Sequence, residues 1–281
     1  MNAFGGASVR EALDSAVIAI AAGGSDTPRL DAEVLLAAAL GIDRTALFLD
    51  PMRQVTGPAV RAFQDAVRRR SAGREPVAYI TGRRGFRHIE LAVDARVLVP
   101  RPETELLVEV GVELLARGAR VVDVGTGSGA IALALRDERP DLEVTGTDVS
   151  AGALAVARDN AARLGLAGDV AFVEGDLLAG LGEVDAVLSN PPYVAEGERV
   201  ALAPEILRHE PAGALFAGAD GLDVIRRLVP AAVAAGARLA AIEVGEGQAA
   251  AVRALMVEAG FATVQVRRDL AGIERVVAGS R

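Results

Sequence analysis

The stretch Asp123-Val124-Gly125-Thr126-Gly127-Ser128-Gly129 decides the fold of this 281-residue chain. Residues 120–124 form a short apolar run typical of a buried strand, and residues 130–139 have apolar positions at helical spacing. Glycines at such a turn let the backbone approach a ligand closely, and free amides at a helix start favour electron-rich groups. The stretch therefore predicts a strand–loop–helix unit that binds a nucleoside cofactor.

Strand and helix patterns alternate from residue 98 to the end of the chain. Two final strands follow each other with no helix between them, which predicts an antiparallel closing hairpin. The pattern as a whole predicts an α/β, Rossmann-like domain with a mostly parallel seven-stranded sheet, covered on both faces. The predicted strands are residues 120–124, 143–147, 170–173, 185–189, 238–244, 263–268 and 274–278, and the predicted helices are residues 103–116, 130–139, 151–164, 222–235 and 248–259.

The first 73 residues predict a small helical bundle. Ser8-Val9-Arg10-Glu11 has the form of a capping box, and the Thr27-Pro28 and Thr56-Gly57-Pro58 elements open further helices. The run Arg68-Arg69-Arg70 ends the last of these helices, where we predict a solvated helix end, with a partner-binding patch as the alternative.

A connector with two β-prone pieces, residues 77–80 and 89–93, is predicted to form a hairpin between the bundle and the α/β domain. We therefore expect three parts: residues 1–73, 74–97 and 98–281.

Composition excludes several kinds of chemistry. The chain has no cysteine and no lysine, which excludes disulfides, thiolate metal sites, Schiff bases and a P-loop lysine. Two histidines, His88 and His209, are too few for a histidine-rich zinc site, and we predict no metal. The net charge of −8 argues against stable nucleic-acid binding. No apolar run reaches the roughly 18 residues that span a bilayer, so we expect a cytoplasmic protein.

An acidic residue ends the second strand of the α/β domain about one βα unit after the glycine loop. Asp148 can accept hydrogen bonds from both hydroxyls of a ribose. The loop itself leaves the cofactor open, because Gly125, Gly127 and Ala130 fit S-adenosylmethionine, a dinucleotide or a plain tight turn. Asp176 follows the third strand, where it can read an adenine amino group or cap a helix.

The fourth strand runs directly into Asn190-Pro191-Pro192-Tyr193. Two prolines stiffen the loop and leave carbonyl groups pointing outward. The Asn190 side-chain oxygen and the Pro191 carbonyl can accept both hydrogens of one planar NH2 group, and Tyr193 can stack on its flat face. Such a pocket holds a poorly nucleophilic amide or ring nitrogen and aims it at an electrophile. These residues predict methyl transfer to nitrogen from S-adenosylmethionine.

With these motifs, the chain resembles the release-factor glutamine methyltransferases, bacterial enzymes that methylate the glutamine side-chain amide in the Gly-Gly-Gln motif of class I peptide chain release factors. The resemblance covers nearly the whole chain. The discriminating match is the Pro-Arg-Pro-Glu-Thr-Glu element, because Asn-Pro-Pro-Tyr also occurs in enzymes that methylate DNA or RNA bases. Further matches are Glu75-Pro76, Tyr79-Ile80, Pro100-Arg101-Pro102-Glu103-Thr104-Glu105, Glu210-Pro211, Ala214-Leu215 and Asp220-Gly221-Leu222.

The resemblance implies a class I S-adenosylmethionine-dependent methyltransferase domain and a role for each motif. Arg101 and Glu103 shape the pocket mouth or, alternatively, form an ion-paired helix start. Leu177 stands where some relatives carry an aromatic residue, so it packs on adenine without stacking. The implied cofactor residues are Asp123, Gly125, Thr126, Gly127, Ser128, Gly129, Asp148, Asp176, Leu177 and Asn190; the glutamine is held by Asn190, Pro191, Pro192 and Tyr193, of which Asn190, Pro191 and Tyr193 are catalytic.

The resemblance also implies that the helical bundle docks a release factor, and we expect a monomer. The first alternative is a methyltransferase acting on amino groups of DNA or RNA bases, for which Arg83, Arg84, Arg87 and His88 would supply a basic patch. Two other classes remain as alternatives: a dinucleotide-dependent oxidoreductase and a non-catalytic binding module.

Overall fold

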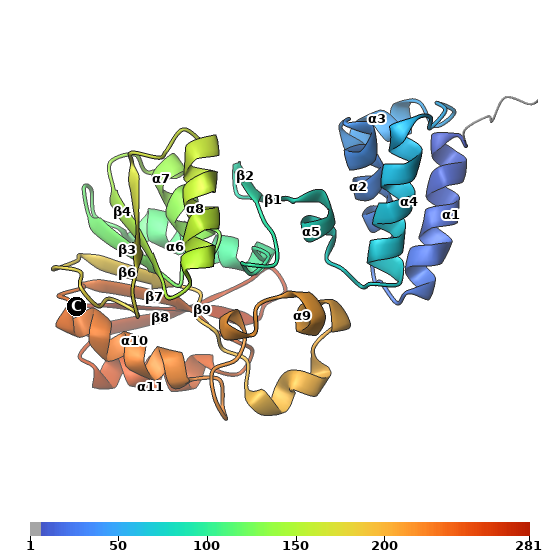
Figure 1. Cartoon of the computed structure of the whole chain (residues 1–281). Coiled ribbons are helices and arrows are strands. Elements are labelled where there is room, and N and C mark those ends of the chain that lie inside the picture. Colours follow the sequence, from blue (N-terminus) through green and yellow to red (C-terminus); the bar gives the residue numbers. More distant parts are fainter. Residues whose placement is uncertain (1–6) are drawn as a thin grey trace, which may run out of the picture. The chain divides into compact units, whose positions relative to one another are not determined.

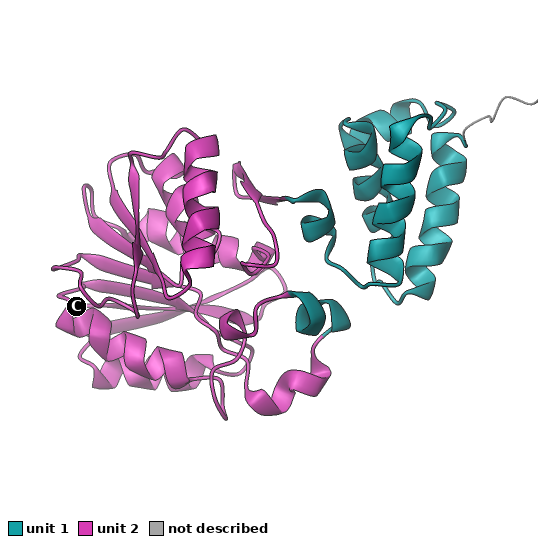
Figure 2. Cartoon of the chain, in the orientation of Figure 1, with its two compact units in different colours: residues 1–82, 203–209 teal, residues 83–202, 210–281 magenta. Residues whose placement is uncertain are grey.

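The structure, a computed structural model, describes residues 7–281. The chain forms two compact units (Figure 2). The first contains the chain up to Gly82 together with Ala203–His209, and the second contains Arg83–Leu202 and Glu210–Arg281. The division thus falls at Gly82 rather than at the predicted positions 73 and 97, and a short segment from the second half of the chain joins the first unit.

The first unit consists of helices. Ser8 caps α1 as predicted: Glu11 N donates to Ser8 Oγ at 3.3 Å, and Ser8 N donates to Glu11 Oε2 at 2.8 Å. Gly41 ends α2 in the left-handed region at φ 65°. The helices are α1 (Val9–Ala22), α2 (Pro28–Leu40), α3 (Arg44–Leu49), α4 (Pro58–Ser71), α5 (Val77–Thr81) and α9 (Pro204–His209).

Ion pairs explain why α9 belongs to the first unit. Arg70, at the end of α4, is buried, and its Nε donates to Asp31 Oδ2 at 2.6 Å. Arg70 Nη1 donates to Glu205 Oε1 at 3.3 Å, and Arg74 also pairs with Glu205. The prediction of a solvated helix end is therefore wrong for Arg70, because two carboxylates distant in sequence compensate its burial.

The predicted connector hairpin is wrong in its first strand. Val77–Thr81 forms the short helix α5, in which Ile80 N donates to the Pro76 carbonyl at 3.1 Å. The hairpin instead pairs β1 (Arg83–Phe86) with β2 (Ile89–Ala92). The β-branched residues of this segment have only a weak local preference for a strand, and the burial of Ala78 and Tyr79 in the helix overrides it.

The second unit contains the predicted seven-stranded sheet, in the order β5-β4-β3-β6-β7-β9-β8. The first five strands in this order are parallel, and β9 runs antiparallel to both of its neighbours. Every strand predicted for this sheet and the closing hairpin are confirmed. The strands are β3 (Arg120–Val124), β4 (Glu143–Asp148), β5 (Val170–Glu174), β6 (Ala186–Ser189), β7 (Leu239–Glu243), β8 (Thr263–Arg268) and β9 (Glu274–Ser280).

Helices cover both faces of this sheet (Figure 1): α6, α7 and α8 lie on one side, and α10 and α11 lie on the other. Their bounds are α6 (Glu105–Leu114), α7 (Ala130–Glu138), α8 (Ala151–Arg163), α10 (Asp223–Ala234) and α11 (Ala249–Glu258). Three 3₁₀ turns complete the unit: η1 (Pro102–Thr104), η2 (Glu196–Ala201) and η3 (Ala212–Ala214).

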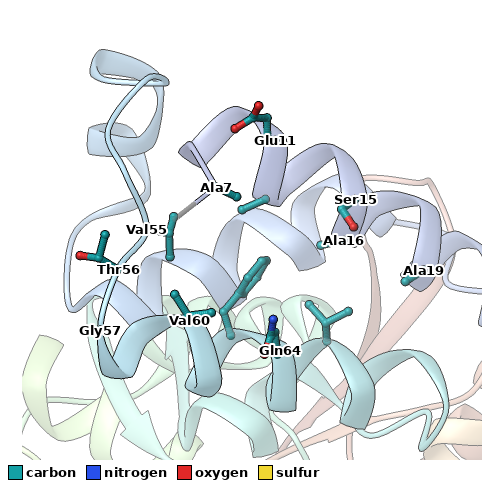
Figure 3. Close-up of a pocket in the computed structure, with 13 residues that line it drawn as sticks. Ala7, Glu11, Ser15, Ala16, Ala19, Val55, Thr56, Gly57, Val60 and Gln64 are labelled. Atoms are coloured by element: carbon teal, nitrogen blue, oxygen red, sulfur yellow. The ribbon is translucent and has the colours of Figure 1, made fainter. Parts of the chain in front are cut away.

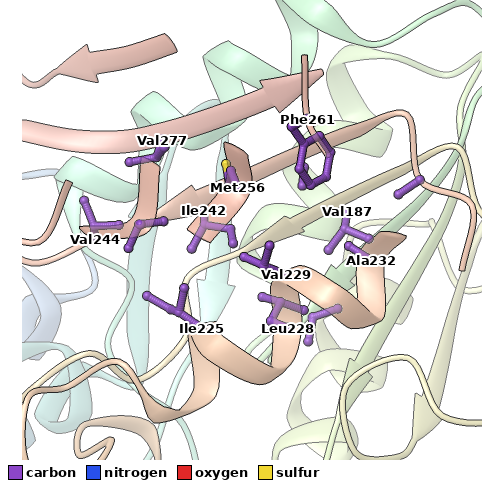
Figure 4. Close-up of a cluster of buried hydrophobic side chains, with 14 of the residues drawn as sticks. Val187, Ile225, Leu228, Val229, Ala232, Ile242, Val244, Met256, Phe261 and Val277 are labelled. Carbon is purple, nitrogen blue, oxygen red and sulfur yellow. The ribbon is translucent and has the colours of Figure 1, made fainter. Parts of the chain in front are cut away.

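A large apolar cluster fixes α10 and α11 against the sheet (Figure 4). Ile225 and Leu228 of α10 and Met256 of α11 are fully buried against strand residues such as Val187 and Ile242. This packing holds β6 and β7 in place, and therefore also the loops that follow them.

The strand order places the predicted site at one edge of the sheet. From β3 the chain moves outward to β4 and β5, then crosses to β6 on the other side of β3. The carboxyl ends of β3, β4 and β6 therefore meet at a topological switch point, where α/β sheets bind ligands. None of the helices in residues 7–281 has the length and apolar character to cross a membrane.

Candidate functional site

The glycine loop joins β3 to α7 and is open on one side. Gly125, Gly127 and Gly129 all have positive φ, at 73°, 56° and 83°, which favours glycine. A Cβ atom added at Gly125 or Gly127 would meet no atom within 4 Å, so protein packing does not explain these glycines. The open side leaves room for a ligand against the backbone.

Side chains beneath the loop hold its shape. Thr126 and Ser128 are buried; the Thr126 hydroxyl donates to Asp123 Oδ2 at 2.6 Å, and the Ser128 carbonyl accepts from Asn160 Nδ2 at 2.9 Å. Asp123 is completely buried, and burial raises the pKa of its carboxyl to about 7. Its Oδ1 accepts no hydrogen bond from the described residues, so it remains available to a donor.

Asp148 lies at the end of β4, beside the loop. Its Oδ2 accepts Gly127 N at 2.9 Å, and its Oδ1 accepts Ser150 N at 2.9 Å. Each carboxylate oxygen can accept a second hydrogen bond. The structure thus brings Asp148 to the glycine loop with acceptor capacity left for ribose hydroxyls.

Asp176 and Leu177 follow β5. Asp176 is exposed and ion-paired with Arg227 of α10, and no helix begins at it, so the helix-cap alternative is wrong. Leu177 has a positive φ of 56°, and its carbonyl accepts the Thr147 hydroxyl at 2.9 Å. This hydrogen bond ties the turn to β4; contact of either residue with adenine stays a prediction.

The Asn-Pro-Pro-Tyr loop follows β6 directly. Asn190 Nδ2 donates to Thr104 Oγ1 at 3.0 Å, which leaves Asn190 Oδ1 as an acceptor. Tyr193 is half-buried, and its hydroxyl lies 3.4 Å from Glu243 Oε1. Burial, with the Glu243 charge, raises the pKa of Tyr193, so its hydroxyl stays protonated and donates. Gln248 Nε2 donates to the Tyr193 carbonyl at 2.9 Å and fixes the loop's end.

Arg101 and Glu103 flank the turn η1. Arg101 Nη2 donates to Glu210 Oε1 at 2.7 Å, and Glu103 is exposed. The alternative of an ion-paired helix start is therefore wrong for Arg101, whose partner Glu210 belongs to another of the sequence motifs; the role of Arg101 and Glu103 at the pocket mouth stays a prediction. The described residues contain no group of three or more histidine, cysteine, aspartate or glutamate side chains arranged for a metal.

A separate cavity of about 570 Å³ lies in the first unit (Figure 3). Residues such as Ser15 of α1 and Val60 of α4 line it, together with Val55 and Thr56 from the segment before α4. None of the predicted site residues contributes to it.

Two family models match the chain. The PrmC N-terminal domain matches residues 11–82, and the methyltransferase small domain matches residues 102–234. A release factor glutamine methyltransferase of Deinococcus radiodurans is 44% identical, over 97% of this chain and 98% of the relative. One of Caulobacter vibrioides is 42% identical, over 91% of this chain and 90% of the relative. The chain belongs to the release factor glutamine methyltransferase family.

Solved structures agree with this family's fold. The hMettl16 catalytic domain in complex with MAT2A 3′UTR hairpin 1 has a TM-score of 0.56 at 17% identity, covering 79% of this chain and 80% of that one. A methyltransferase from Pyrococcus furiosus has a TM-score of 0.50 at 17% identity, covering 68% of this chain and 87% of that one. The relatives and the matching methyltransferase model show that this chain is a methyltransferase, and the solved structures show that it has the class I fold.

Three residues of the candidate site were not predicted from the sequence. Thr104 lies inside a quoted motif but received no role, and Glu243 and Gln248 were not considered. Glu243 did carry a signal, because it lies inside the predicted strand 238–244, in which the only other charged residue is Arg238 at the first position. Buried charges in strands are costly unless they are paired, and they often mark function.

Gly221 gives a testable link between the Asp-Gly-Leu motif and the site. A Cβ atom at Gly221 would lie 2.0 Å from the Tyr193 carbonyl oxygen and 2.7 Å from Gln248 Nε2. We expect Gly221→Ala to displace Tyr193 and lower kcat by about 10- to 100-fold. Cofactor affinity, measured by calorimetry, is expected to stay within about twofold.

Gly182→Ala is the matched control, because a Cβ atom there meets nothing within 4 Å. Equal kcat values for the two variants would contradict the role given to Gly221.

Proposed function

We propose that this enzyme transfers a methyl group from S-adenosylmethionine to the glutamine side-chain amide nitrogen in the Gly-Gly-Gln motif of class I peptide chain release factors. The observation that carries this proposal is the hydrogen bond made by the Asn190 side chain. Its Nδ2 is already engaged by Thr104 at 3.0 Å, so its Oδ1 is left to accept from an incoming NH2 group. The names of the relatives support the same substrate.

The residues around the glycine loop fit S-adenosylmethionine. Asp148 has acceptor capacity for ribose hydroxyls, and the free Oδ1 of Asp123 suits a cationic donor. Gly125 and Gly127 keep open space beside the backbone. When bound, S-adenosylmethionine supplies an electrophilic sulfonium methyl group.

The Asn-Pro-Pro-Tyr residues prepare the acceptor nitrogen. An amide nitrogen is a poor nucleophile because its lone pair is delocalised into the carbonyl group. The Asn190 side-chain oxygen and the Pro191 carbonyl would accept its two hydrogens, orient it and increase its electron density. Tyr193 would stack on the flat amide. The methyl group replaces one amide hydrogen, and the released proton goes to water.

We propose that the first unit docks the release factor. The match of residues 11–82 to the PrmC N-terminal domain supports a distinct module of this kind. Exposed apolar side chains on its helices, Ile18, Phe48 and Leu49, are available for protein contacts. The net charge of −8 favours a protein substrate over stable nucleic-acid binding, and we propose a cytoplasmic monomer.

Methyl-labelled S-adenosylmethionine tests the function. Separate reactions would contain a class I release factor, the same factor with its Gly-Gly-Gln glutamine changed to alanine, tRNA, and DNA. We expect label on the intact factor alone. Label on tRNA or DNA would overturn the substrate and favour methylation of a base amino group. Binding of NAD instead of S-adenosylmethionine in a calorimeter would overturn the cofactor.

A further inference from the structure

Gln248 joins three separate segments of the second unit through its side-chain amide. Its Nε2 donates to the carbonyl oxygen of Tyr193 at 2.9 Å and to that of Asp220 at 3.2 Å. Its Oε1 accepts Gly245 N at 2.9 Å. The three partners belong to the Asn-Pro-Pro-Tyr loop, the Asp-Gly-Leu motif and the turn between β7 and α11, so one side chain links all three segments.

The chemistry of these partners fixes the orientation of the Gln248 amide. A backbone N–H only donates and a backbone carbonyl only accepts. The N–H of Gly245 therefore requires the amide oxygen, and the two carbonyl groups require the NH2 group. Both hydrogens of that NH2 group are used within the protein, so Gln248 serves to hold the backbone rather than to bind a substrate.

Two glycines leave the space that Tyr193 occupies. A Cβ atom at Gly245 would lie 3.2 Å from Tyr193 Cδ2, so the ring packs directly against the backbone of the turn between β7 and α11. A Cβ atom at Gly221 would lie 2.0 Å from the Tyr193 carbonyl oxygen. The protein therefore contacts Tyr193 closely at both its carbonyl group and its ring.

The turn that carries Gln248 is anchored to the core. Val244 N donates to the Arg275 carbonyl of β9 at 2.9 Å, and Val244 and Met256 of α11 are completely buried in the apolar cluster of Figure 4. The Asn-Pro-Pro-Tyr loop, in contrast, contains two prolines that cannot donate backbone hydrogen bonds. Contacts to its carbonyl groups and side chains must therefore fix its position, and Gln248 supplies such a contact from the anchored turn.

We propose that Gln248 is a positioning residue that holds the Tyr193 ring in place over the methyl-acceptor amide. This inference rests on the proposed function, in which the ring stacks on the flat glutamine amide. In this role Gln248 acts through Tyr193. A displacement of about 1 Å in an active site can lower the rate by about 100-fold, so a link to a rigid support affects turnover.

Gln248→Glu tests the role in catalysis, because glutamate keeps the length and shape of glutamine. One carboxylate oxygen could still accept Gly245 N, but the other would face the Tyr193 and Asp220 carbonyl oxygens with no hydrogen to donate. We expect kcat to fall by about 10- to 100-fold, with the cofactor dissociation constant within about twofold of the parent value. Gln265→Glu, the same change on the outer strand β8, is the matched control and should keep kcat.

A double-mutant cycle with Tyr193→Ala separates positioning of the ring from a general structural role. If Gln248 acts through the ring, Gln248→Glu should lower kcat by less than about threefold once the ring is absent, because the two changes then remove the same interaction. Single-turnover transfer of labelled methyl measures all four proteins. An equal loss of kcat with and without the ring would overturn the proposal.

Tyrosine NMR tests the placement of the ring without any methyl acceptor. The chain has two tyrosines, Tyr79 and Tyr193, so ring-selective ¹³C labelling gives two sets of signals, and Tyr193→Phe assigns them. We expect the Tyr193 ring signals to shift in Gln248→Glu and to stay unchanged in Gln265→Glu. Tyr79, which lies on α5 of the first unit, is the internal reference. Unchanged Tyr193 ring signals in Gln248→Glu would overturn the proposal.

Gly245→Ala is a second variant that reaches the same ring without changing any charge. Its added Cβ atom, 3.2 Å from Tyr193 Cδ2, should shift the same ring signals and lower kcat. A folded Gly245→Ala protein with parental kcat and shifted Tyr193 signals would show that turnover does not depend on the ring position, and would overturn the proposal.

The outcomes also separate this inference from the proposed function. An enzyme that labels no release factor but shows the expected Tyr193 shift would overturn the proposed function and leave the link between Gln248 and Tyr193 intact. A release factor labelled at the parental rate by Gln248→Glu would overturn the positioning role and leave the proposed function intact. The two failures are therefore distinguishable.

Discussion

Asn190→Ala is expected to lower kcat for glutamine methylation by about 100- to 1,000-fold, the loss typical of removing one preorganised polar group from an active site. Alanine removes the side-chain oxygen that would accept an amide hydrogen, and it also removes the donor to Thr104 at 3.0 Å. The Pro191 carbonyl would remain as the single acceptor. The measurement is single-turnover transfer of labelled methyl to a release factor at saturating cofactor.

The cofactor dissociation constant of Asn190→Ala should stay within about threefold of the parent value, because the glycine loop and Asp148 are untouched. Gln265→Ala is the control, an amide removed from the outer strand β8. Full turnover in Asn190→Ala would rule out the amide-holding role of the loop. A large loss of cofactor affinity with unchanged kcat would assign Asn190 to the cofactor site rather than to the acceptor pocket.

Asp148→Ala should weaken cofactor binding much more than it lowers kcat. A hydrogen bond to a charged group contributes about 1.5–3 kcal/mol, so losing the ribose contacts should weaken S-adenosylmethionine binding by about 10- to 150-fold. The loop loses a support as well, since Asp148 Oδ2 accepts Gly127 N at 2.9 Å. At saturating cofactor, kcat should fall by less than about fivefold, because the acceptor pocket is intact.

Calorimetric titration with S-adenosylmethionine checks this prediction, with thermal melting to confirm that the variant is folded. Asp137→Ala is the matched control, because Asp137 is exposed on α7. A dissociation constant equal to that of the parent would show that Asp148 does not bind the ribose.

The centre of the sheet could be predicted from the sequence because β3, β6 and β7 are buried on both faces. Runs such as residues 120–124 and 185–189 are mostly apolar, and helices with a clear period separate them. The glycine loop and the Asn-Pro-Pro-Tyr loop were also predictable, since glycine and proline carry strong backbone preferences wherever they occur.

The features of the fold and of the candidate site that could not be predicted depend on contacts between residues distant in sequence. Residues 77–81 make only about one helical turn, so local preference could not identify α5. Arg70 looked like a surface residue because its partner Glu205 is 135 positions away. Thr104 is identified only by the hydrogen bond from Asn190, 86 positions away, and Glu243 only by the Tyr193 hydroxyl, 50 positions away.

Because α9 belongs to the first unit, that unit depends on a segment that is synthesised late in translation. A ribosome releases the first four helices long before it releases Glu205, so the nascent bundle carries Arg70 and Arg74 without one of their carboxylates. Removing one partner from a buried ion pair typically costs about 3–5 kcal/mol, a large share of a small domain's stability. Cotranslational folding of the bundle is therefore completed only after most of the catalytic sheet has been synthesised. A fragment ended at Gly82 would keep the arginines in the same uncompensated state.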